Sequence, residues 1–373
     1  INDSLRGVED AWPAARRAHR DDLLSFAERA YRRPLTPAER AETIAFYQQL
    51  VDRDGLSHVD AVRDCVVSIL MSPHFCYRLH ESTADEPIHP LDDHALADRL
   101  SYFLWSSMPD EELLELALHE RLHAPKVLVQ QSNRMLRDAK VRGLAVEFAG
   151  NWLGYRQFAS HNSVDRNRFP EFDDVLRQAM FEEPVRFTLD VFQNGGSVLD
   201  FLFADHTFVN SELARHYGLD DGLELETKAT GDGWVRAEAV NAVGRGGILP
   251  MAVFMTKNSP GLRTSPVKRG YWVVRQLLGE HIPPPPPNVP DLPNDEAQLG
   301  ELTLREVLAR HRDHESCSGC HEKFDSIGLV FEGYGPIGER RTVDLAGHPV
   351  DTSADFPDGS DRKGLRGLQA YIR

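Results

Sequence analysis

The sequence predicts a mainly α-helical protein, in which a multi-helix body is followed by a proline-rich strap and a small helical unit. In residues 1–220, apolar side chains recur at the spacing of amphipathic helices, as Leu23, Phe26 and Tyr31 do. Later in the chain, HIPPPPPNVPDLP contains an unbroken run of prolines, Pro283–Pro287. Such a run adopts the extended polyproline II conformation and acts as a stiff spacer. A further helical pattern follows the spacer.

Local signals predict where individual helices begin and end. Thr36-Pro37-Ala38-Glu39 has the form of a helix start, with Thr as N-cap, Pro in the first position and Glu in the third. Ser72-Pro73 ends the helix that begins near His58. A long helical pattern has a possible interruption near residues 138–140. In the next long helix Pro184 is internal, and we expect it to kink that helix.

The chain is longer than one hydrophobic core usually organises, because cores stop growing at about 250–300 residues. We predict an N-terminal helical module, a central helical module whose last part (197–218) forms two shorter helices, a loop-rich module with one helix and the strap, and a C-terminal unit that is truncated. Their bounds are 1–84, 85–220, 221–298 and 299–373.

Composition limits the function classes. The chain has 41% hydrophobic and 27% charged residues, which is ordinary for a folded protein. Its formal net charge of −16, without a visible basic stripe, argues against nucleic acid as a partner. No run of about 18 apolar residues is present, so we expect no transmembrane span in this chain.

The motif that predicts chemistry is Cys317-Ser318-Gly319-Cys320-His321. C-x-x-C-H is the sequence by which haem c is attached to a protein. Two thiols three positions apart on one helical turn can each form a thioether with a vinyl group of the same haem, and the histidine then binds the iron through Nε2. We therefore predict a small cytochrome c-like haem unit, with Cys317 and Cys320 as attachment residues and His321 as the proximal iron ligand.

Other interpretations of the two cysteines remain open. A zinc site would need four ligands, with His311, His314 or the distant Cys65 and Cys76 recruited, and no second C-x-x-C exists. A thioredoxin-like dithiol would require a βαβ context, and a structural disulfide would leave the histidine without a role. Cys65 and Cys76 themselves fit buried free thiols better than a disulfide, although the break at Ser72-Pro73 leaves a disulfide possible.

The second axial ligand of the iron is left open by the sequence. No methionine occurs after Met255, so the C-terminal unit has no thioether ligand of its own. Met251 or Met255 from the loop-rich segment are candidates, with Met251 as the first choice, and His348 or His74 are alternatives. A position without a protein ligand would favour ligand or peroxide chemistry over simple electron transfer.

Three arginines are candidates for pairing with haem propionates. Arg263 and Arg269 lie in the densest basic cluster, and Arg340 follows the motif. The alternative is a capped helix start at Ser265-Pro266 that carries surface charges.

Several segments carry a family resemblance: AYRRPLTPAE, LADRLSYFLWSSMPDEELLELA, FADHTFVNSELARHYGL, RTSPVKRGYWVVRQLLGEHIPPPPPNVPDLP and EKFDSIGLVFEGYGPIGERR. In these, the chain resembles the planctomycete-type multidomain c-type cytochrome proteins. It departs from their pattern where Asp325-Ser326-Ile327-Gly328 replaces the usual Asp-Pro-Leu-Gly. The resemblance implies a periplasmic or otherwise extracytoplasmic location and further domains or subunits, so that this chain would be a fragment, a processed piece or a short relative. The activity of the family is itself unsettled.

Two functions follow as hypotheses. The first is an exported c-type cytochrome that passes electrons through one haem c to a redox partner protein or a small electron carrier. The alternative is a haem enzyme with an open distal site, acting on peroxide, oxygen or an organic substrate. A scaffold with a catalytically silent haem unit is a third hypothesis. The sequence alone does not decide whether the protein is an enzyme.

Overall fold

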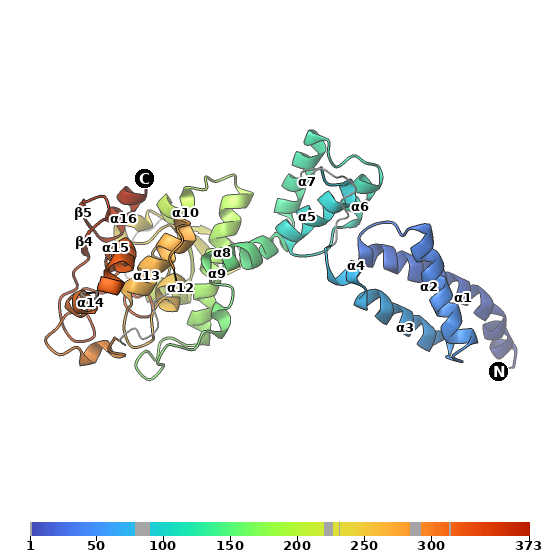
Figure 1. Ribbon diagram of the computed structural model, residues 1–373, viewed down its shortest axis with the longest axis horizontal. Helices are drawn as coiled ribbons and strands as arrows, with labels where there is room; N and C mark the ends of the chain where they lie inside the picture. Colours follow the sequence, from blue (N-terminus) through green and yellow to red (C-terminus); the bar gives the residue numbers. More distant parts are fainter. Residues whose placement is uncertain (1, 79–89, 220–226, 231, 284–291, 313–314) are drawn as a thin grey trace. The chain divides into compact units, whose positions relative to one another are not determined.

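The computed structural model describes residues 2–78, 90–219, 227–230, 232–283, 292–312 and 315–373, and it confirms the mainly α-helical class (Figure 1). The chain forms two compact units, Ile1–Val141 and Arg142–Arg373. The predicted proline strap lies outside the described residues, apart from Pro283. No described helix is long and apolar enough to cross a membrane.

The first unit begins with helices that share one small apolar core. Leu23, Ala27, Cys65 and Ile69 are buried in it. The predicted helix start at Thr36 is confirmed, because Thr36 Oγ1 accepts from Glu39 N at 3.2 Å while Thr36 N donates to Glu39 Oε2 at 2.8 Å. The helices are α1 (Asn2–Tyr31), α2 (Pro37–Asp52), α3 (His58–Met71) and α4 (Pro73–Cys76).

The rest of the first unit is a second group of helices. The side chains of Asp92 and Asp110 cap the starts of α5 and α6, and Trp105 Nε1 donates to the carbonyl oxygen of Met135 at 2.9 Å. The predicted interruption near residues 138–140 is present, since the last helix stops at Arg137 and a 3₁₀ turn follows. The elements are α5 (Asp93–Trp105), α6 (Glu111–Leu118), α7 (Pro125–Arg137) and η1 (Ala139–Val141).

The second unit contains the rest of the helices and both sheets. Pro184 lies inside α9, as predicted, and the side chain of Ser265 caps α13 with Pro266 in the first position. The elements are η2 (Leu144–Ala149), α8 (Gly150–Leu153), η3 (Phe158–Ser160), α9 (Asp174–Gln193), α10 (Asp200–Phe203), β1 (His206–Asn210), α11 (Ser211–Tyr217), β2 (Thr227–Ala229), β3 (Trp234–Glu238), η4 (Val240–Val243), α12 (Ala252–Lys257), α13 (Pro266–Trp272), η5 (Val273–Leu277), η6 (Glu296–Gln298), α14 (Leu304–Arg312), α15 (Glu315–Leu329), β4 (Ser353–Asp355), β5 (Asp361–Lys363) and α16 (Gly364–Ile372).

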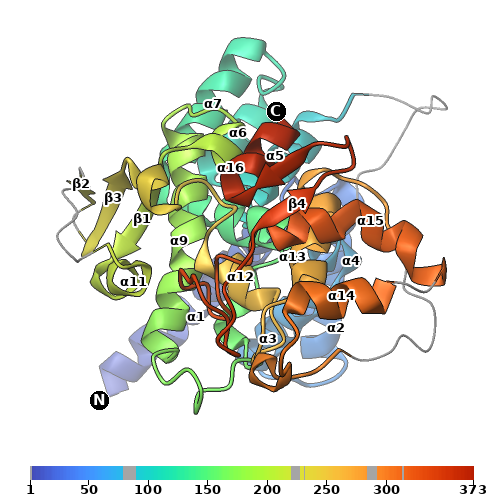
Figure 2. The same ribbon diagram turned by 90° about the vertical axis from the view of Figure 1, so that its left-hand side faces the viewer.

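A three-stranded antiparallel sheet lies on one side of this unit, in the order β1-β3-β2, with His206 opposite Glu238. Figure 2 shows this sheet and the pair α14 and α15 at opposite sides, with α12 and α13 between them. Where we expected two short helices over 197–218, the structure has α10 and α11 with the buried strand β1 between them. Residues 206–210 form a strand because β3 supplies their backbone partners, and that pairing is not visible locally.

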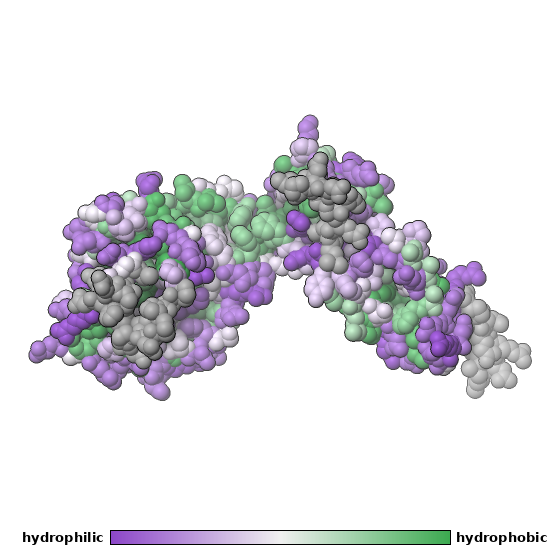
Figure 3. Space-filling view, in the orientation of Figure 1, coloured by the Kyte–Doolittle hydropathy of each residue, from purple (hydrophilic) through white to green (hydrophobic). Residues whose placement is uncertain are grey.

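One cluster of buried apolar side chains extends from Ala145 to Leu368. It includes residues from three of the segments that we separated by sequence, so these segments share a core, while the predicted boundaries themselves stay a prediction. On the face drawn in Figure 3, apolar residues (green) gather over the start of this unit. Two aromatic residues of this segment, Phe148 and Trp152, are 43% and 38% exposed. Trp152 is nevertheless held in place, since its Nε1 donates to the Gln276 carbonyl oxygen at 2.7 Å.

Candidate functional site

The C-x-x-C-H motif lies in the first two turns of α15. Positions three and four residues apart on a helix are neighbours, so Cys317, Cys320 and His321 belong to one face of α15. The structure describes the backbone of the two cysteines and not their side chains. Sequence analysis thus placed the motif on a helix correctly, and the thioether geometry stays a prediction.

The second half of α15 packs tightly against α13 through two glycines. A Cβ added to Gly270 would overlap the carbonyl oxygen of Phe324, and one added to Gly328 would overlap that of Pro266. Phe324 and Ile327 are buried beside this contact. Backbones can approach this closely only where no side chain intervenes, so the glycines fix the position of the helix that carries His321.

His321 is paired with a buried carboxylate one turn further along the same helix. Its Nδ1 lies 2.9 Å from Oδ1 and 3.1 Å from Oδ2 of Asp325, and the Asp325 side chain is 2% exposed. Because a carboxylate accepts hydrogen bonds, the ring proton of a neutral His321 resides on Nδ1, which makes Nε2 the nitrogen with the lone pair. A metal-binding histidine almost always donates its other N–H in this way, so the donor set fits an iron ligand.

Sequence analysis did not single out Asp325 as a functional residue. Its spacing from His321 was the available signal, since residues i and i+4 face each other on a helix. Among the side chains that the structure describes, no group of three or more His, Cys, Asp or Glu residues could hold a metal ion. This finding does not reach the thiols of Cys317 and Cys320, and the zinc alternative is therefore untested.

The candidates for the second axial ligand occupy different surroundings. Met251 and Met255 are 1% and 0% exposed within the core, at the N-cap and inside α12. His348 is partly buried, with Nδ1 3.2 Å from Asp344 Oδ2. His74 belongs to the first unit, next to Tyr31. The choice among them stays a prediction.

Of the predicted propionate-binding arginines, Arg269 is fully buried and holds the loop that follows α15. It donates to the carbonyl oxygens of Phe331 (3.0 Å), Tyr334 (2.6 Å) and Gly335 (2.6 Å). Burial lowers the pKa of Arg269 to about 10. These contacts give Arg269 a scaffolding role, because they join α13 to the segment immediately after the motif helix.

The other two predicted arginines, Arg263 and Arg340, form fewer hydrogen bonds with the rest of the fold than Arg269 does. Arg263 is buried, its Nη1 donates to the carbonyl oxygen of Thr264 at 2.9 Å, and burial lowers its pKa. Arg340 donates to the carbonyl oxygen of Val243 at 3.2 Å and lies over the ring of Tyr334. A role of either residue toward a propionate stays a prediction.

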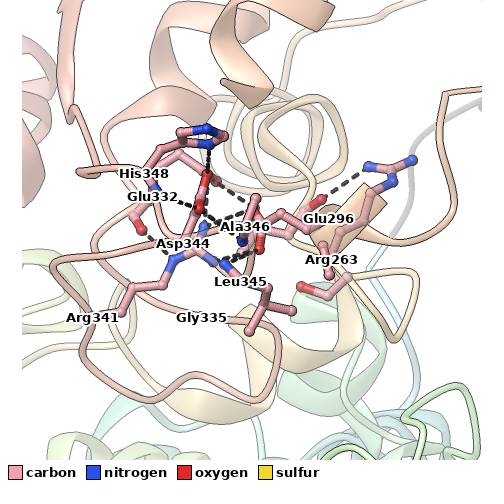
Figure 4. A network of polar contacts seen from close by, with 12 residues as sticks. Arg263, Glu296, Glu332, Gly335, Arg341, Asp344, Leu345, Ala346 and His348 are labelled. Atoms are coloured by element: carbon pink, nitrogen blue, oxygen red, sulfur yellow. Dashed lines mark hydrogen bonds and ion pairs between the residues drawn. The ribbon is translucent and has the colours of Figure 1, made fainter. Parts of the chain in front are cut away.

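A buried ion network that sequence analysis missed lies beside the loop that follows α15 (Figure 4). Arg341 bonds Glu296 (Nη1 to Oε2, 2.7 Å) and Glu332 (Nη2 to Oε2, 2.8 Å), and Thr264 Oγ1 donates to Glu332 at 2.8 Å. Burial raises the pKa of Glu332. The network joins η6, the start of α13 and the loop after α15, and no signal in the sequence indicated it, because the partners lie far apart along the chain.

The fold and the motif together define a mainly α-helical protein with a cytochrome-like module, and comparison with known families agrees. Three models of domains of unknown function match: DUF1595 (PSD5) at residues 18–79, DUF1592 (PSD4) at 91–219 and DUF1588 (PSCyt3) at 245–344. The name PSCyt3 denotes a cytochrome-like module, and its match includes Cys317–His321. The chain belongs to the planctomycete-type multidomain c-type cytochrome family, whose modules these are. No curated protein and no solved structure matches it significantly.

Proposed function

We propose that this protein is an exported c-type cytochrome that transfers electrons through one haem c. Cys317 and Cys320 would hold the haem by thioether links, and His321 would bind the iron through Nε2. When bound, the haem supplies reversible one-electron oxidation and reduction of its iron. The observation that carries the proposal is the pairing of His321 Nδ1 with the buried Asp325 carboxylate inside a C-x-x-C-H helix.

The chain's own residues prepare this site in two ways. Asp325 holds the Nδ1 proton of His321, which orients the ring and makes Nε2 a better donor of electron density. Gly270 and Gly328 keep α15 against α13, so the imidazole is presented from a helix whose position is fixed. A histidine held in one orientation would rearrange little between the ferric and ferrous states of a bound iron, which suits electron transfer.

The partner and the location follow from the proposed cofactor. We infer a redox partner protein or a small electron carrier, since a protein with one single-electron cofactor would need an electron donor and an electron acceptor outside itself. A periplasmic or other extracytoplasmic location accords with the family, whose haem is attached outside the cytoplasm. Cell fractionation of the native host tests the location.

The alternative of a haem enzyme with an open distal site is favoured by the same carboxylate. A more basic imidazole of His321 would donate more electron density to a bound iron and stabilise its ferric state, which suits peroxide chemistry. No methionine follows Met255 in the sequence, so the C-terminal unit has none of its own to serve as the second axial ligand. We therefore retain this second function beside electron transfer.

The deciding experiment is expression in a host that matures c-type cytochromes. Intact-mass analysis should show one covalently bound haem, and the C317A/C320A double variant should lose it while it remains folded. A bare polypeptide, or stoichiometric zinc in the wild type, would overturn the proposal. A ferrous absorption spectrum unchanged by carbon monoxide supports electron transfer, whereas carbon monoxide binding supports the enzyme.

A further inference from the structure

A cleft of about 480 Å³ in the second unit is lined mainly by cationic and neutral polar side chains, together with two glycines and Phe158. The segment 150–162 forms most of it, and the end of α12 closes it with Lys257. None of its described lining residues is an aspartate or a glutamate, although the chain as a whole carries 58 acidic and 42 basic residues. The lining includes no residue of α15, so the cleft is built separately from the proposed haem site.

Lys257 is a half-buried cation without a counter-ion. Among the residues that the structure describes, none forms a hydrogen bond or an ion pair with Lys257 Nζ. The ammonium group lies directly over the backbone at Gly154, where an added Cβ would overlap it, and Gly154 has a φ of +82°. Burial lowers the pKa of Lys257, and no acidic group among the described residues offsets this effect. Because a buried cation without a partner costs stability, the fold retains an unfavourable charge in this cleft.

The neighbouring groups leave Lys257 as the uncompensated charge. Arg156, which also lines the cleft, is already paired, with Nε 2.6 Å from Glu147 Oε2. His161 stacks on Phe158 with ring centroids 5.2 Å apart. Burial lowers the pKa of His161, and the charge of Lys257 lowers it further, so the imidazole is a neutral hydrogen-bonding group at pH 7.

We propose that this cleft binds a small polar anion, whose carboxylate, phosphate or sulfate group pairs with Lys257. His161 and the amide groups of Gln157 and Asn162 line the same cleft, and Nε2 of His161 already lies 2.7 Å from Ser163 Oγ. The two amides and the other ring nitrogen of His161 would supply hydrogen bonds for the rest of the ligand. The volume lies within the range of about 300–1,000 Å³ that small-molecule sites occupy. Gly154 serves the site because it lets the ammonium approach the backbone and stay inside the cleft.

Stability and binding should respond to Lys257 in opposite directions. In K257M the buried charge is replaced by an apolar side chain of similar length, so the protein without ligand should melt at a higher temperature than the wild type. The same variant should lose anion binding. A lysine that merely fills space would show neither effect, and a lysine that stabilises the fold would show a lower melting temperature.

The test uses the full chain at pH 7 and constant ionic strength, with calorimetric titration and thermal unfolding. The probes are inorganic phosphate, inorganic sulfate, D-glucuronate as a hydroxylated carboxylate, and D-glucose as its uncharged counterpart. At least one anion should bind the wild type saturably in the millimolar range or tighter, and raise its melting temperature, whereas glucose should do neither. K257M should bind at least tenfold more weakly. K257R, which keeps the charge, should retain binding.

The matched control is K363M, because Lys363 is an exposed lysine of the same unit outside the cleft. It should bind the anion as the wild type does. Saturable binding by none of the anions, equal binding of glucuronate and glucose, or unchanged affinity in K257M would each overturn the proposal. The result is independent of haem attachment, since phosphate and sulfate binding can be measured with the C317A/C320A variant as well.

Discussion

The Nδ1 atom of His321 lies 2.9 Å from Oδ1 of Asp325, one helical turn away, and the carboxylate is almost fully buried. Burial shields this pair from water and keeps the ring in one orientation. A second histidine–carboxylate pair in the same unit contains no candidate iron ligand, with His206 Nε2 3.2 Å from Asp190 Oδ2. The two pairs therefore allow a controlled comparison of what a carboxylate does to a histidine inside and outside the motif.

Replacing the carboxylate beside His321 should raise the reduction potential of the attached haem. In D325N the amide cannot accept the Nδ1 proton as strongly, so the imidazole donates less electron density and the ferric state loses stability. A tenfold loss in the preference for ferric iron corresponds to about 59 mV, and we expect a rise of about that size. Redox titration followed by absorption spectroscopy measures it.

D190N is the control for this prediction, since it removes a carboxylate from His206, which lies outside the C-x-x-C-H motif and is no candidate for an iron ligand. It should leave the midpoint potential within about 10 mV of the wild type. Equal shifts in both variants would mean that the effect is one of net charge, and no shift in D325N would contradict a coupling between Asp325 and the iron ligand.

Methyl groups at the α13–α15 contact should destabilise the second unit. G270A and G328A each place a Cβ against a backbone carbonyl that cannot move without displacing a helix. Overpacking of this kind costs about 1–3 kcal/mol, which exceeds the gain of about 1 kcal/mol from replacing a helical glycine. Urea unfolding followed by the fluorescence of the buried Trp272 measures the change.

The matched control lies on the same helix. A Cβ on Gly319 meets nothing within 4 Å, so G319A should be neutral or stabilise the protein by about 0.5–1 kcal/mol. If G270A and G328A behaved like G319A, the close approach of α13 and α15 would be wrong. A gain of stability in all three would indicate that helix propensity and not packing decides the outcome.

An interaction could be predicted from the sequence when its partners lie close together along the chain. The cap at Thr36 and the one at Ser265 involve partners within three residues, and both were predicted correctly. The motif helix was also predicted, and the His321–Asp325 pair could have been, because its spacing is one helical turn.

Interactions between distant segments were not predictable. Arg341 and Glu296 are 45 positions apart, and nothing local indicates that they meet. Strand β1 exists because β3 pairs with it, and Lys257 is notable only because no acidic side chain in the described part of the chain pairs with it. Each of these features depends on tertiary packing, which overrides or adds to the local pattern.

The stability of the second unit should fall as the pH rises from about 4.5 to 7 because of Glu183. Burial raises the pKa of Glu183 to about 7 from 4.5, despite hydrogen bonds from Thr207 and Tyr217 at 2.6 Å each. In this window the folded protein binds more protons than the unfolded chain, so the free energy of unfolding decreases with pH. The contribution is present below pH 4.5 and is lost through pH 7.

E183Q should remove this dependence. Its amide stays neutral at every pH, so the difference in unfolding free energy between pH 5 and pH 8 should shrink by about 2–3 kcal/mol relative to the wild type. E322Q, at an exposed position of α15, should leave the difference unchanged. An identical pH profile in wild type and E183Q would show that the buried carboxyl group does not titrate in this range.

The two early cysteines should differ sharply in reactivity. Cys65 is 1% exposed, and burial raises the pKa of its thiol to about 11, whereas Cys76 is exposed, and both are free. Since the thiolate is the reactive form, iodoacetamide at pH 8 should modify Cys76 and spare Cys65 in the native protein. Peptide mass analysis reads the two sites separately, and denaturation with guanidinium should expose Cys65 to the reagent. If neither site reacted until a reductant was added, the two thiols would be joined in a disulfide. Cys65 would then have to pack differently against α1, because its sulfur would be bonded to that of Cys76.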